Sequence, residues 1–314
     1  MSKLKTLIRL LTKNQGALVL SAGRIGLLNW MPDKPYLRLA FQGVMGYPLN
    51  LKDPKTFNEK LQWLKLYDRR PEYTKMVDKY AVRKYIADTI GEECLIPLLG
   101  VWDDPDEIDF NALPDQFVLK CNHNSGIGLC ICKDKSKLDI KKVKKELWRG
   151  LNQDYYLAGR EWPYKNMPRK IIAEQCMVDE SGYELKDYKF FCFNGEPKAL
   201  FVATDRNKLN EEVKFDFYDL EWNHLPFVNG HQNANRAIPK PASFDKMIKI
   251  ALVLSKGIPQ VRVDLYDING HVYFGELTFS HFSGFVPFQP EEWDYTFGSW
   301  LELPQFPTEQ RKVK

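Results

Sequence analysis

The chain has 314 residues, of which 44% are hydrophobic and 13% are aromatic. This composition indicates a globular protein with a substantial core and excludes a largely disordered chain. The 45 basic and 41 acidic residues give a net charge of +4, which by itself argues neither for nor against nucleic acid. We expect no nucleic-acid partner.

Cysteine usage bears on the cellular compartment. The six cysteines lack the spacing of a disulfide framework or a zinc ribbon, and several fall in predicted strands, where thiols behave as small apolar residues. No signal peptide is evident, and the apolar run 16–30 is too short to span a bilayer. The sequence therefore predicts a cytoplasmic protein.

The N-terminal segment 1–13 places Leu4, Leu7, Ile8 and Leu11 at helical spacing among basic residues. One interpretation is an amphipathic helix that makes peripheral contact with the inner face of an anionic membrane. The other, which we favour, is a helix docked on its own domain or a frayed terminus.

Two helices predict a helical N-terminal lobe. The first opens at Thr56 with a capping box, because Glu59 follows three residues later. The second runs from about Glu72 to Thr89. We expect its charged pairs at 78–79 and 83–84 to form a solvated face.

The next candidate element is a strand, a loop and a second strand. Residues 115–121 predict a strand that carries Lys120 near its end, and residues 129–132 predict its partner. The loop between them, 122–128, is small, polar and glycine-bearing, as in loops that lay backbone N–H groups over phosphates. It lacks the Gly-Lys-Ser/Thr of a P-loop. Taken alone, an ordinary hairpin turn is the favoured interpretation.

Further strands carry polar residues at spaced positions. An apolar strand at 171–177 contains Glu174 and Gln175, and the strand after it carries Asp187 and Lys189 on one face. The later elements expected in chain order are strands at 198–204 and 213–219, a loop at 229–241 and a helix at 243–256.

Residues 261–284 predict a β-hairpin that presents two acids. Apolar and polar residues alternate from Val261 to Tyr266, as in a strand with one buried face. Asn269-Gly270 is a turn sequence, since both residues tolerate positive φ. Asp264 and Glu276 then lie on paired strands.

Whether these two acids share a face depends on the register. A two-residue turn pairs Asp264 with Gly275 and points Glu276 to the opposite face, whereas a loop of three or five residues brings both acids together with Arg262 and Thr278. We predict the longer loop, because two acids and an arginine in an apolar sheet require a charged ligand between them. A bulge in the hairpin would have the same effect.

The assembled order resembles the ATP-grasp superfamily and, more narrowly, its teichuronopeptide-biosynthesis (TupA-like) branch. The matching stretches cover most of residues 50–285 and are TFNEKLQWLK (56–65), DKYAVRKYI (78–86), FVLKCNHNSG (117–126), DYKFFCFNGEPKALFVATDR (187–206) and VRVDLY…FGELTFSHFSGF (261–285). The resemblance implies an α+β ATP-grasp fold, in which two antiparallel-sheet lobes clamp a nucleotide. The expected divisions are a helical N-terminal lobe with a connector strand (1–114), a small lobe (115–176), a large lobe (177–303) and a tail (304–314).

The resemblance also implies an ATP-dependent carboxylate–amine ligase that uses ATP and Mg²⁺. The nucleotide-binding residues it implies are Lys120, His123, Ser125, Gly126, Glu174, Gln175, Cys176, Asp187 and Lys189. The implied metal ligands are Asp264, Glu276 and Thr278, and the implied catalytic residues are Arg262 and Lys189. Two positions depart from the family pattern: Thr278 stands where asparagine is common, and Asn124 stands where glycine is expected.

The implied substrates are an amino acid or amine and a uronic-acid-containing sugar or polysaccharide of the cell surface, such as a capsule. From the residues alone, Arg206 either binds a substrate anion or pairs with Asp205. His281 and Ser283 either line the substrate pocket or belong to an ordinary loop after the strand. A phosphotransferase with the same fold and a glycosyltransferase of the same pathway are the alternatives, although no Rossmann βαβ pattern supports the latter.

Overall fold

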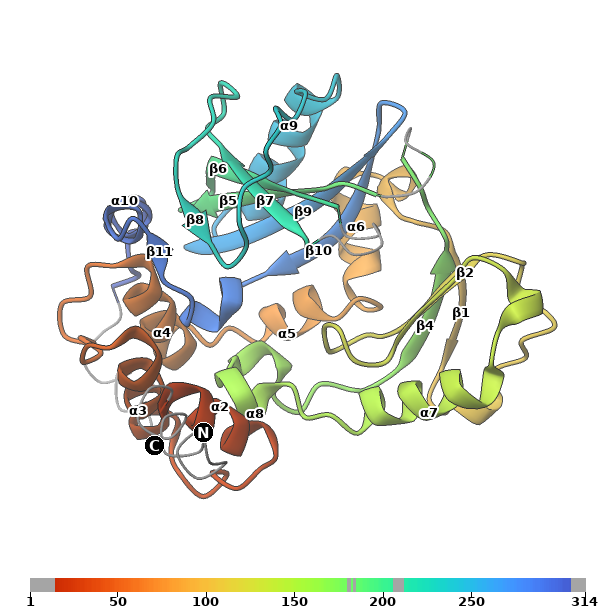
Figure 1. Ribbon diagram of the computed structural model, residues 1–314, viewed down its shortest axis with the longest axis horizontal. Coiled ribbons are helices and arrows are strands. Elements are labelled where there is room, and N and C mark those ends of the chain that lie inside the picture. The colour runs from red at the N-terminus through yellow and green to blue at the C-terminus, as the bar shows by residue number, and fades with distance from the viewer. Residues whose placement is uncertain (1–14, 180–181, 183–184, 206–211, 306–314) are drawn as a thin grey trace, which may run out of the picture.

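The computed structural model describes residues 15–179, 182, 185–205 and 212–305. Helices α2 (Gln15–Arg24), α3 (Asp33–Met45) and α4 (Phe57–Tyr67) form a group beside two antiparallel sheets (Figure 1). The amphipathic segment 1–13 and residues 306–314 of the tail lie outside the described residues. In the ranges described, no helix is both long enough and apolar enough to cross a membrane.

Helix α4 joins the helical group to the large sheet. The predicted capping box is confirmed, because the Thr56 hydroxyl accepts the Glu59 N–H and the Glu59 carboxylate accepts the Thr56 N–H. Phe57 at the start of the helix is fully buried, 5.8 Å from the ring of Phe297 in α10 (Glu292–Trp300). Burial of such a side chain stabilises the fold by about 1.5–3 kcal/mol.

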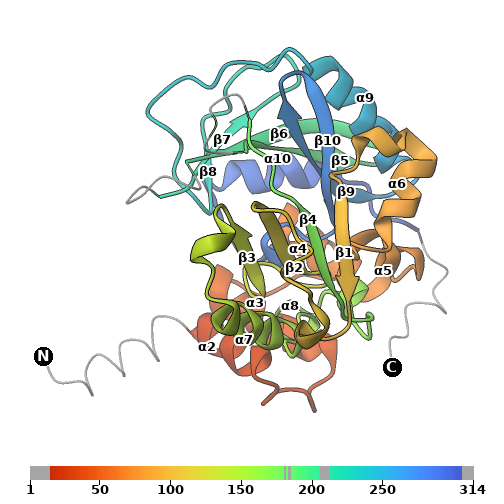
Figure 2. The same cartoon turned by 90° about the vertical axis from the view of Figure 1, so that its right-hand side faces the viewer.

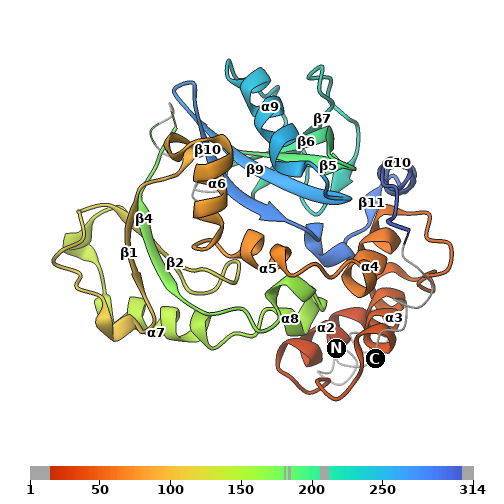
Figure 3. The same cartoon turned by 180° about the vertical axis from the view of Figure 1, so that it is seen from behind.

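The second predicted helix is two helices, α5 (Glu72–Val77) and α6 (Val82–Ile90). Helix α5 lies between α4 and α6, and α6 lies between the large sheet and the small sheet (Figure 3). The prediction of one continuous helix is wrong at 78–81. There the Asp78 carboxylate accepts the N–H groups of Tyr80 and Ala81, so it caps a turn in place of continuing the helix.

The small sheet has the strand order β1 (Leu98–Trp102), β4 (Ile171–Gln175), β2 (Phe117–Cys121) and β3 (Leu129–Cys132), all antiparallel (Figure 2). Helix α7 (Ile140–Leu151) packs on β2 and β3 through Val143 and Leu147. Strand β1 is an edge of this sheet, so the sheet begins before the predicted division at residue 115.

The large sheet has the order β10 (His271–Thr278), β9 (Gln260–Ile268), β5 (Asp187–Phe193), β6 (Glu196–Thr204) and β7 (Lys214–Tyr218), also antiparallel. Helix α9 (Phe244–Ser255) covers one face, against Phe190 of β5. Neighbouring residues of a strand point to opposite faces, so Phe191 packs on the other side, toward α10. Asp187 and Lys189 share that second face.

Smaller elements complete the second face of the large sheet. Strands β8 (Val228–Asn229) and β11 (Phe288–Gln289) pair beside it, and α8 (Tyr156–Gly159) contacts α2. Helices combined with two antiparallel sheets give the α+β architecture that the sequence predicts.

Candidate active site

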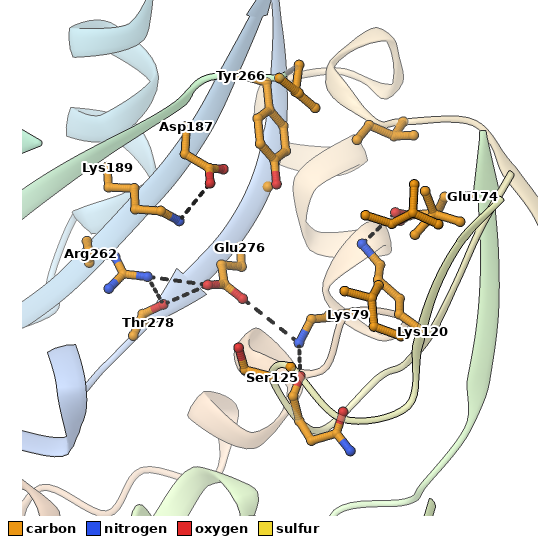
Figure 4. A pocket seen from close by; sticks show the side chains of 18 of the residues that line it. Lys79, Lys120, Ser125, Glu174, Asp187, Lys189, Arg262, Tyr266, Glu276 and Thr278 are labelled. Carbon is orange, nitrogen blue, oxygen red and sulfur yellow. Dashed lines mark hydrogen bonds and ion pairs between the residues drawn. The ribbon is translucent and has the colours of Figure 1, made fainter. Parts of the chain in front are cut away.

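A cavity of about 480 Å³ lies between the two sheets (Figure 4). Its wall on the large sheet includes Asp187, Lys189, Arg262, Tyr266, Gly275, Glu276 and Thr278. The opposite wall, on the small sheet and its loop, includes Lys120, Asn124, Ser125, Gly126, Leu129, Ile131, Glu174, Gln175 and Cys176. Most of the predicted site residues therefore face one space.

The hairpin reaches this arrangement through a bulge. Asn269 and Gly270, with φ of 54° and 81°, form a two-residue turn, so the predicted longer loop is wrong. The register then shifts by one at Gly275, and Glu276 pairs with Asp264. A bulge residue leaves the ladder and restores both acids to one face.

Glycine suits the bulge because a side chain at this position would be crowded by its neighbours. A Cβ at position 275 would lie 3.0 Å from the carbonyl oxygen of Asp264 and 3.0 Å from the Tyr266 ring. The Tyr266 ring itself lines the cavity. The bulge therefore sets both the facing of Glu276 and the position of an aromatic wall.

Arg262 is the centre of the hairpin wall. Its Nε donates to Asp264 Oδ1 at 2.7 Å and its Nη2 donates to Asp264 Oδ2 at 2.8 Å. Nη2 also lies 3.3 Å from Glu276 Oε1 and 3.0 Å from the Thr278 hydroxyl. This bidentate, charge-assisted geometry fixes the guanidinium plane against the cavity. The four hairpin residues converge as predicted.

His281 completes the Arg262 network. Arg262 Nη1 lies 2.8 Å from His281 Nδ1, and His281 Nε2 lies 2.9 Å from Asn229 Oδ1. Burial lowers the pKa of the His281 ring, and the charges of Arg262 and Lys189 lower it further. The ring is therefore neutral, with Nδ1 accepting from the arginine and Nε2 donating to the amide oxygen.

Asp264 is not among the residues that line the cavity, and its role as a direct metal ligand stays a prediction. Its side chain is fully buried and its carboxylate is bonded by both Arg262 and Lys189. Two cations already occupy its oxygens, so it positions them. Within the described residues, no three or more His, Cys, Asp or Glu side chains are grouped to hold a metal ion.

Glu276 and Thr278 do line the cavity. Burial acts to raise the pKa of the Glu276 carboxyl, but the charges of Lys79, Lys189 and Arg262 outweigh it and hold that pKa below its ordinary value. Mg²⁺ is commonly held by one or two protein oxygens together with substrate phosphates. These two side chains fit a Mg²⁺ ion that arrives with a nucleotide, and their role as ligands stays a prediction.

The opposite wall presents Lys120, whose Nζ lies 2.6 Å from Glu174 Oε2. Arg83 reaches the same carboxylate, 3.3 Å from Oε1. Arg83 therefore is not part of the solvated face expected for its helix. The Glu174 carboxylate thus pairs with both cations. Its side chain is occupied by these two ion pairs.

Sequence reasoning missed Lys79. The turn that breaks the predicted helix sends its side chain into the cavity, where Nζ donates to the carbonyl of Asn124 at 2.9 Å and lies 3.9 Å from Glu276 Oε2 (Figure 4). Burial lowers the pKa of this ammonium. The Asp-Lys pair inside a helical pattern was the available signal, because aspartate favours turns.

The loop after β2 differs from expectation at one residue. Ser125 and Gly126 line the cavity, but His123 does not. His123 is 2% exposed, with Nε2 3.1 Å from the carbonyl of Gln153, and burial lowers its pKa to about 4. Its ring supports the loop from beneath. Asn124 has no positive φ and its amide donates to Gly150, so glycine is not required there.

The end of the cavity at β4 is largely apolar, with Ile131, Met177 and Val178 beside Gln175 and Cys176. The Gln175 N–H already donates to the carbonyl of Pro97 at 3.0 Å, so that group is not left for a ligand. Apolar side chains of this kind suit a planar base. The contacts of Gln175 and Cys176 with a nucleotide stay predictions.

Of the predicted substrate residues, His281 and Ser283 both line the cavity. Arg206 lies outside the described residues. Asp205, its expected partner, accepts a bidentate contact from Arg236 at 2.8 and 2.9 Å.

Comparison with solved structures finds proteins that share parts of this fold. The chain is similar to a D-alanine–D-alanine ligase from Bacillus anthracis complexed with ATP, with 15% identity, a TM-score of 0.38, and coverage of 65% of this chain and 53% of that one. It is also similar to the ATP-grasp ligase PsnB complexed with minimal precursor, Mg and ADP (12% identity, TM-score 0.37, coverage of 71% and 58%). The chain thus spans little more than half the length of these proteins. No curated protein matched the sequence.

The family model of TupA-like ATP-grasp proteins matches residues 59–302. Two antiparallel sheets that enclose a cation-lined cavity agree with this match. Because the match covers well over half of the chain, the chain belongs to the TupA-like ATP-grasp family. This confirms the predicted family and fold. The two solved structures named above are complexes with ATP and with Mg and ADP, respectively.

Proposed function

We propose that the protein is a carboxylate–amine ligase, which joins an amino acid or other amine to the carboxylate of a uronic-acid-containing sugar or polysaccharide in cell-surface polysaccharide biosynthesis. The new bond would be a C–N bond, formed with release of ADP and phosphate. The observation that supports this most is the fixed guanidinium of Arg262, which faces the cavity across from Lys79 and Lys120.

The charges of the two walls suit phosphoryl transfer. Lys79 and Lys120 on one side and Lys189 and Arg262 on the other present four positive groups to one cavity. Positive groups fixed before the reaction stabilise charge that develops on phosphate oxygens. Bound with the nucleotide near Glu276, Mg²⁺ would add to this neutralisation.

A carboxylate is a poor electrophile, and phosphorylation corrects this. The γ-phosphoryl group of ATP would pass to a carboxylate oxygen of the substrate, giving ADP and an acyl phosphate. The amine nitrogen would then attack the carbonyl carbon, the C–O bond to phosphate would break, and the nitrogen would lose a proton. Arg262 would neutralise the phosphoryl oxygens, and the sheet walls would exclude water from the acyl phosphate.

Two alternative functions would give different products. A phosphotransferase would use the same cavity but release a stable phosphorylated product without an amine. A glycosyltransferase on a Rossmann sheet finds no support in the fold, because the strand pairs of the described residues are antiparallel.

The test is a screen for ADP release. Purified protein with ATP and Mg²⁺ would be given each amino acid in combination with glucuronic acid, galacturonic acid, their oligomers or their nucleotide-linked forms. We expect ADP only when amine and acceptor are both present, with a product mass equal to their sum less one water. A phosphorylated acceptor formed without amine, or sugar transfer without ADP, would overturn the proposal. Glu276→Gln provides the inactive control.

We also propose peripheral contact with an anionic membrane, which is the less favoured of the two interpretations of segment 1–13. After α2, Ile25, Leu27 and Trp30 are 72%, 66% and 75% exposed, with Arg24 and Lys34 exposed beside them. Exposed apolar side chains with a basic border favour an anionic lipid surface. Sedimentation with phosphatidylglycerol vesicles should carry the protein down, and phosphatidylcholine vesicles should not. Unchanged sedimentation after serine replacement of the three apolar residues would contradict this.

A further inference from the structure

The floor of the cavity is a second group of side chains that the sequence analysis did not assign. Tyr155, Glu161 and Tyr164 flank the short helix α8 and line the same cavity as Arg262 and Glu276. The charges of Arg262 and Glu276 act on the pKa of Glu161, so the floor lies close to the hairpin wall, where the proposed phosphoryl transfer would take place.

Glu161 is a buried carboxylate without a fixed cation. Its side chain is 4% exposed, and its Oε1 accepts a hydrogen bond from the Ser283 hydroxyl. Throughout the described part of the chain, no lysine or arginine nitrogen lies within 4 Å of its carboxylate. Burial raises the pKa of this carboxyl. A buried carboxylate that opens on a cavity favours a cationic ligand there.

The side chain of Lys65, near Glu161, bonds to backbone carbonyl groups. Its Nζ donates to the carbonyls of Gly159 at 2.7 Å and Ser283 at 2.9 Å and lies 4.5 Å from the centre of the Phe285 ring. Burial lowers the pKa of this ammonium to about 7. Lys65 thus fixes the backbone on both sides of Glu161. Its charge lowers the pKa of the Glu161 carboxyl against the effect of burial, but it makes no direct ion pair with that carboxylate.

The turn that carries Ser283 is held in an uncommon conformation. Phe282 and Ser283 have φ of 47° and 55°, and Gln62 Nε2 donates to the carbonyls of Ser283 and Gly284 at 3.0 and 2.8 Å. Left-handed backbone at non-glycine residues persists where surrounding contacts impose it. These contacts aim the Ser283 hydroxyl at Glu161 and hold one carboxylate oxygen in place.

Two aromatic rings stand beside the carboxylate. The ring centres of Tyr155 and Tyr164 lie 4.7 Å apart with planes at 60°. Burial raises the pKa of both hydroxyls, and the nearby charges of Glu161 and Glu276 act in the same direction. Both rings therefore remain neutral. A carboxylate with neutral aromatic faces is the chemistry that recognises an ammonium group.

The N-terminal helices hold this floor in place. The Tyr36 hydroxyl donates to the carbonyl of Ala158 at 2.8 Å, and Arg160 donates to the carbonyl of Leu28 at 2.8 Å. The Arg160 guanidinium also lies over the Tyr36 ring at 4.3 Å. Tyr36 and Leu28 precede the family match at 59–302. A part of the chain outside the family match therefore shapes the floor.

We propose that Glu161, with the rings of Tyr155 and Tyr164, binds the ammonium group of the amine substrate and brings its nitrogen to the phosphoryl end of the cavity. This assignment rests on the proposed ligase function. It names the substrate class of the floor as a primary amine that is cationic in solution, such as a free amino acid.

Direct binding tests the assignment without turnover. The protein loaded with Mg²⁺ and a non-hydrolysable ATP analogue would be titrated calorimetrically with the free L-amino acids and ethanolamine. The N-acetylated form of each ligand that binds would be the neutral match. We expect at least one amine to bind and its acetylated form to bind at least roughly tenfold more weakly, since a charge-assisted contact is lost.

Substitutions at Glu161 and Tyr155 test whether the amine binds at the floor of the cavity. Glu161→Gln should weaken amine binding by roughly 10- to 100-fold and leave binding of the ATP analogue unchanged, which also reports that the cavity is intact. Tyr155→Leu should weaken amine binding by roughly 2- to 5-fold, while Tyr155→Phe, which keeps the ring, should not. The exposed control Glu93→Gln should bind as the wild type does.

Three results would overturn the assignment: no amine in the panel binds, the acetylated ligand binds equally, or Glu161→Gln binds amine like the wild type. These results are separable from failure of the proposed function. Amine binding that needs Glu161, without ADP release under any pairing, would keep the floor assignment and remove the ligase proposal. ADP release that Glu161→Gln leaves unchanged would do the reverse.

Discussion

The two walls of the cavity are built differently. On the hairpin wall, Arg262 contacts Asp264, Glu276, Thr278 and His281 within 3.3 Å. On the small-sheet wall, Lys120 shares a single carboxylate with Arg83, and Leu129 and Ile131 of β3 are 45% and 48% exposed. The charges of the hairpin wall are paired with one another, whereas the small-sheet wall leaves apolar side chains exposed.

This difference indicates that the two lobes contribute differently to ligand binding and to catalysis. A network of buried, mutually bonded charges is preorganised, so it costs little to reorient at the moment of reaction. Exposed apolar side chains gain most when a ligand covers them. Substitutions in the hairpin wall should therefore change both stability and turnover, and those in the opposite wall should change ligand affinity alone.

Asp264→Asn should have the largest effect. It removes the shared anion of Arg262 and Lys189 and leaves buried positive charge uncompensated, which costs about 3–5 kcal/mol of stability. ADP formation should fall roughly 100-fold or more, because the guanidinium loses its orientation. Chemical unfolding followed by fluorescence and an ADP-release assay measure the two effects.

Glu276→Gln is the matched comparison for Asp264→Asn. Its side chain is 35% exposed toward the cavity, so the stability change should be about 1 kcal/mol or less, although ADP formation should also be lost. An unfolding midpoint for Asp264→Asn equal to that of the wild type would contradict the positioning role of this aspartate.

Lys120→Met tests the opposite wall and should act on nucleotide affinity. Loss of a charge-assisted contact to phosphate weakens binding by about 1.5–3 kcal/mol, or roughly 10- to 100-fold. The unfolding midpoint should move little, because Arg83 still pairs with Glu174. Titration with ATP in the presence of Mg²⁺ measures this, with Lys145→Met on exposed α7 as the control. Equal affinity in both variants would remove Lys120 from the phosphate site.

The contrast between the walls also separates what the sequence could predict from what it could not. Alternation and turn chemistry place Asp264 and Glu276 on paired strands, and strand length places Lys120 at a strand end. A bulge was the stated alternative to a longer loop, but its position at Gly275 was not predicted, because it depends on the close approach of Gly275 to Tyr266 and to the Asp264 backbone. The prediction that Glu276 shares a face with Asp264 came from the need for a charged ligand between the two acids. The residue pattern alone did not give it.

Contacts between distant segments account for the residues that were missed. The turn that frees Lys79 is held by Asn122, whose amide donates to Asp78 and whose carbonyl accepts the Lys79 N–H. Local helical periodicity cannot include a partner 44 residues away. Glu161 belongs to no motif and gains its setting from Ser283, 122 residues later. Long-range packing, not local preference, decides such positions.

The smallest expected effect concerns the support of the loop beneath the small-sheet wall. Burial lowers the pKa of His123 to about 4 from an ordinary value of 6.5. Between these values the unfolded chain binds a proton that the folded protein does not, so the stability that neutral His123 contributes is present above pH 6.5 and is lost as the pH falls toward 4. By pH 5.5 the loss should be roughly 1–2 kcal/mol.

His123→Gln removes this titration and keeps a donor for the Gln153 carbonyl. The wild type should be the more stable protein at pH 7, and the gap between the two unfolding midpoints should narrow at pH 4.5, because other titrating groups are common to both. Parallel midpoints across this range would show that His123 binds protons equally in the folded and the unfolded chain. Below pH 6.5 its ring would then be bonded as a cation between Gln153 and Asn122, whose oxygens lie 3.1 and 3.3 Å from its two nitrogens, and the small-sheet wall would carry one more charge at that pH.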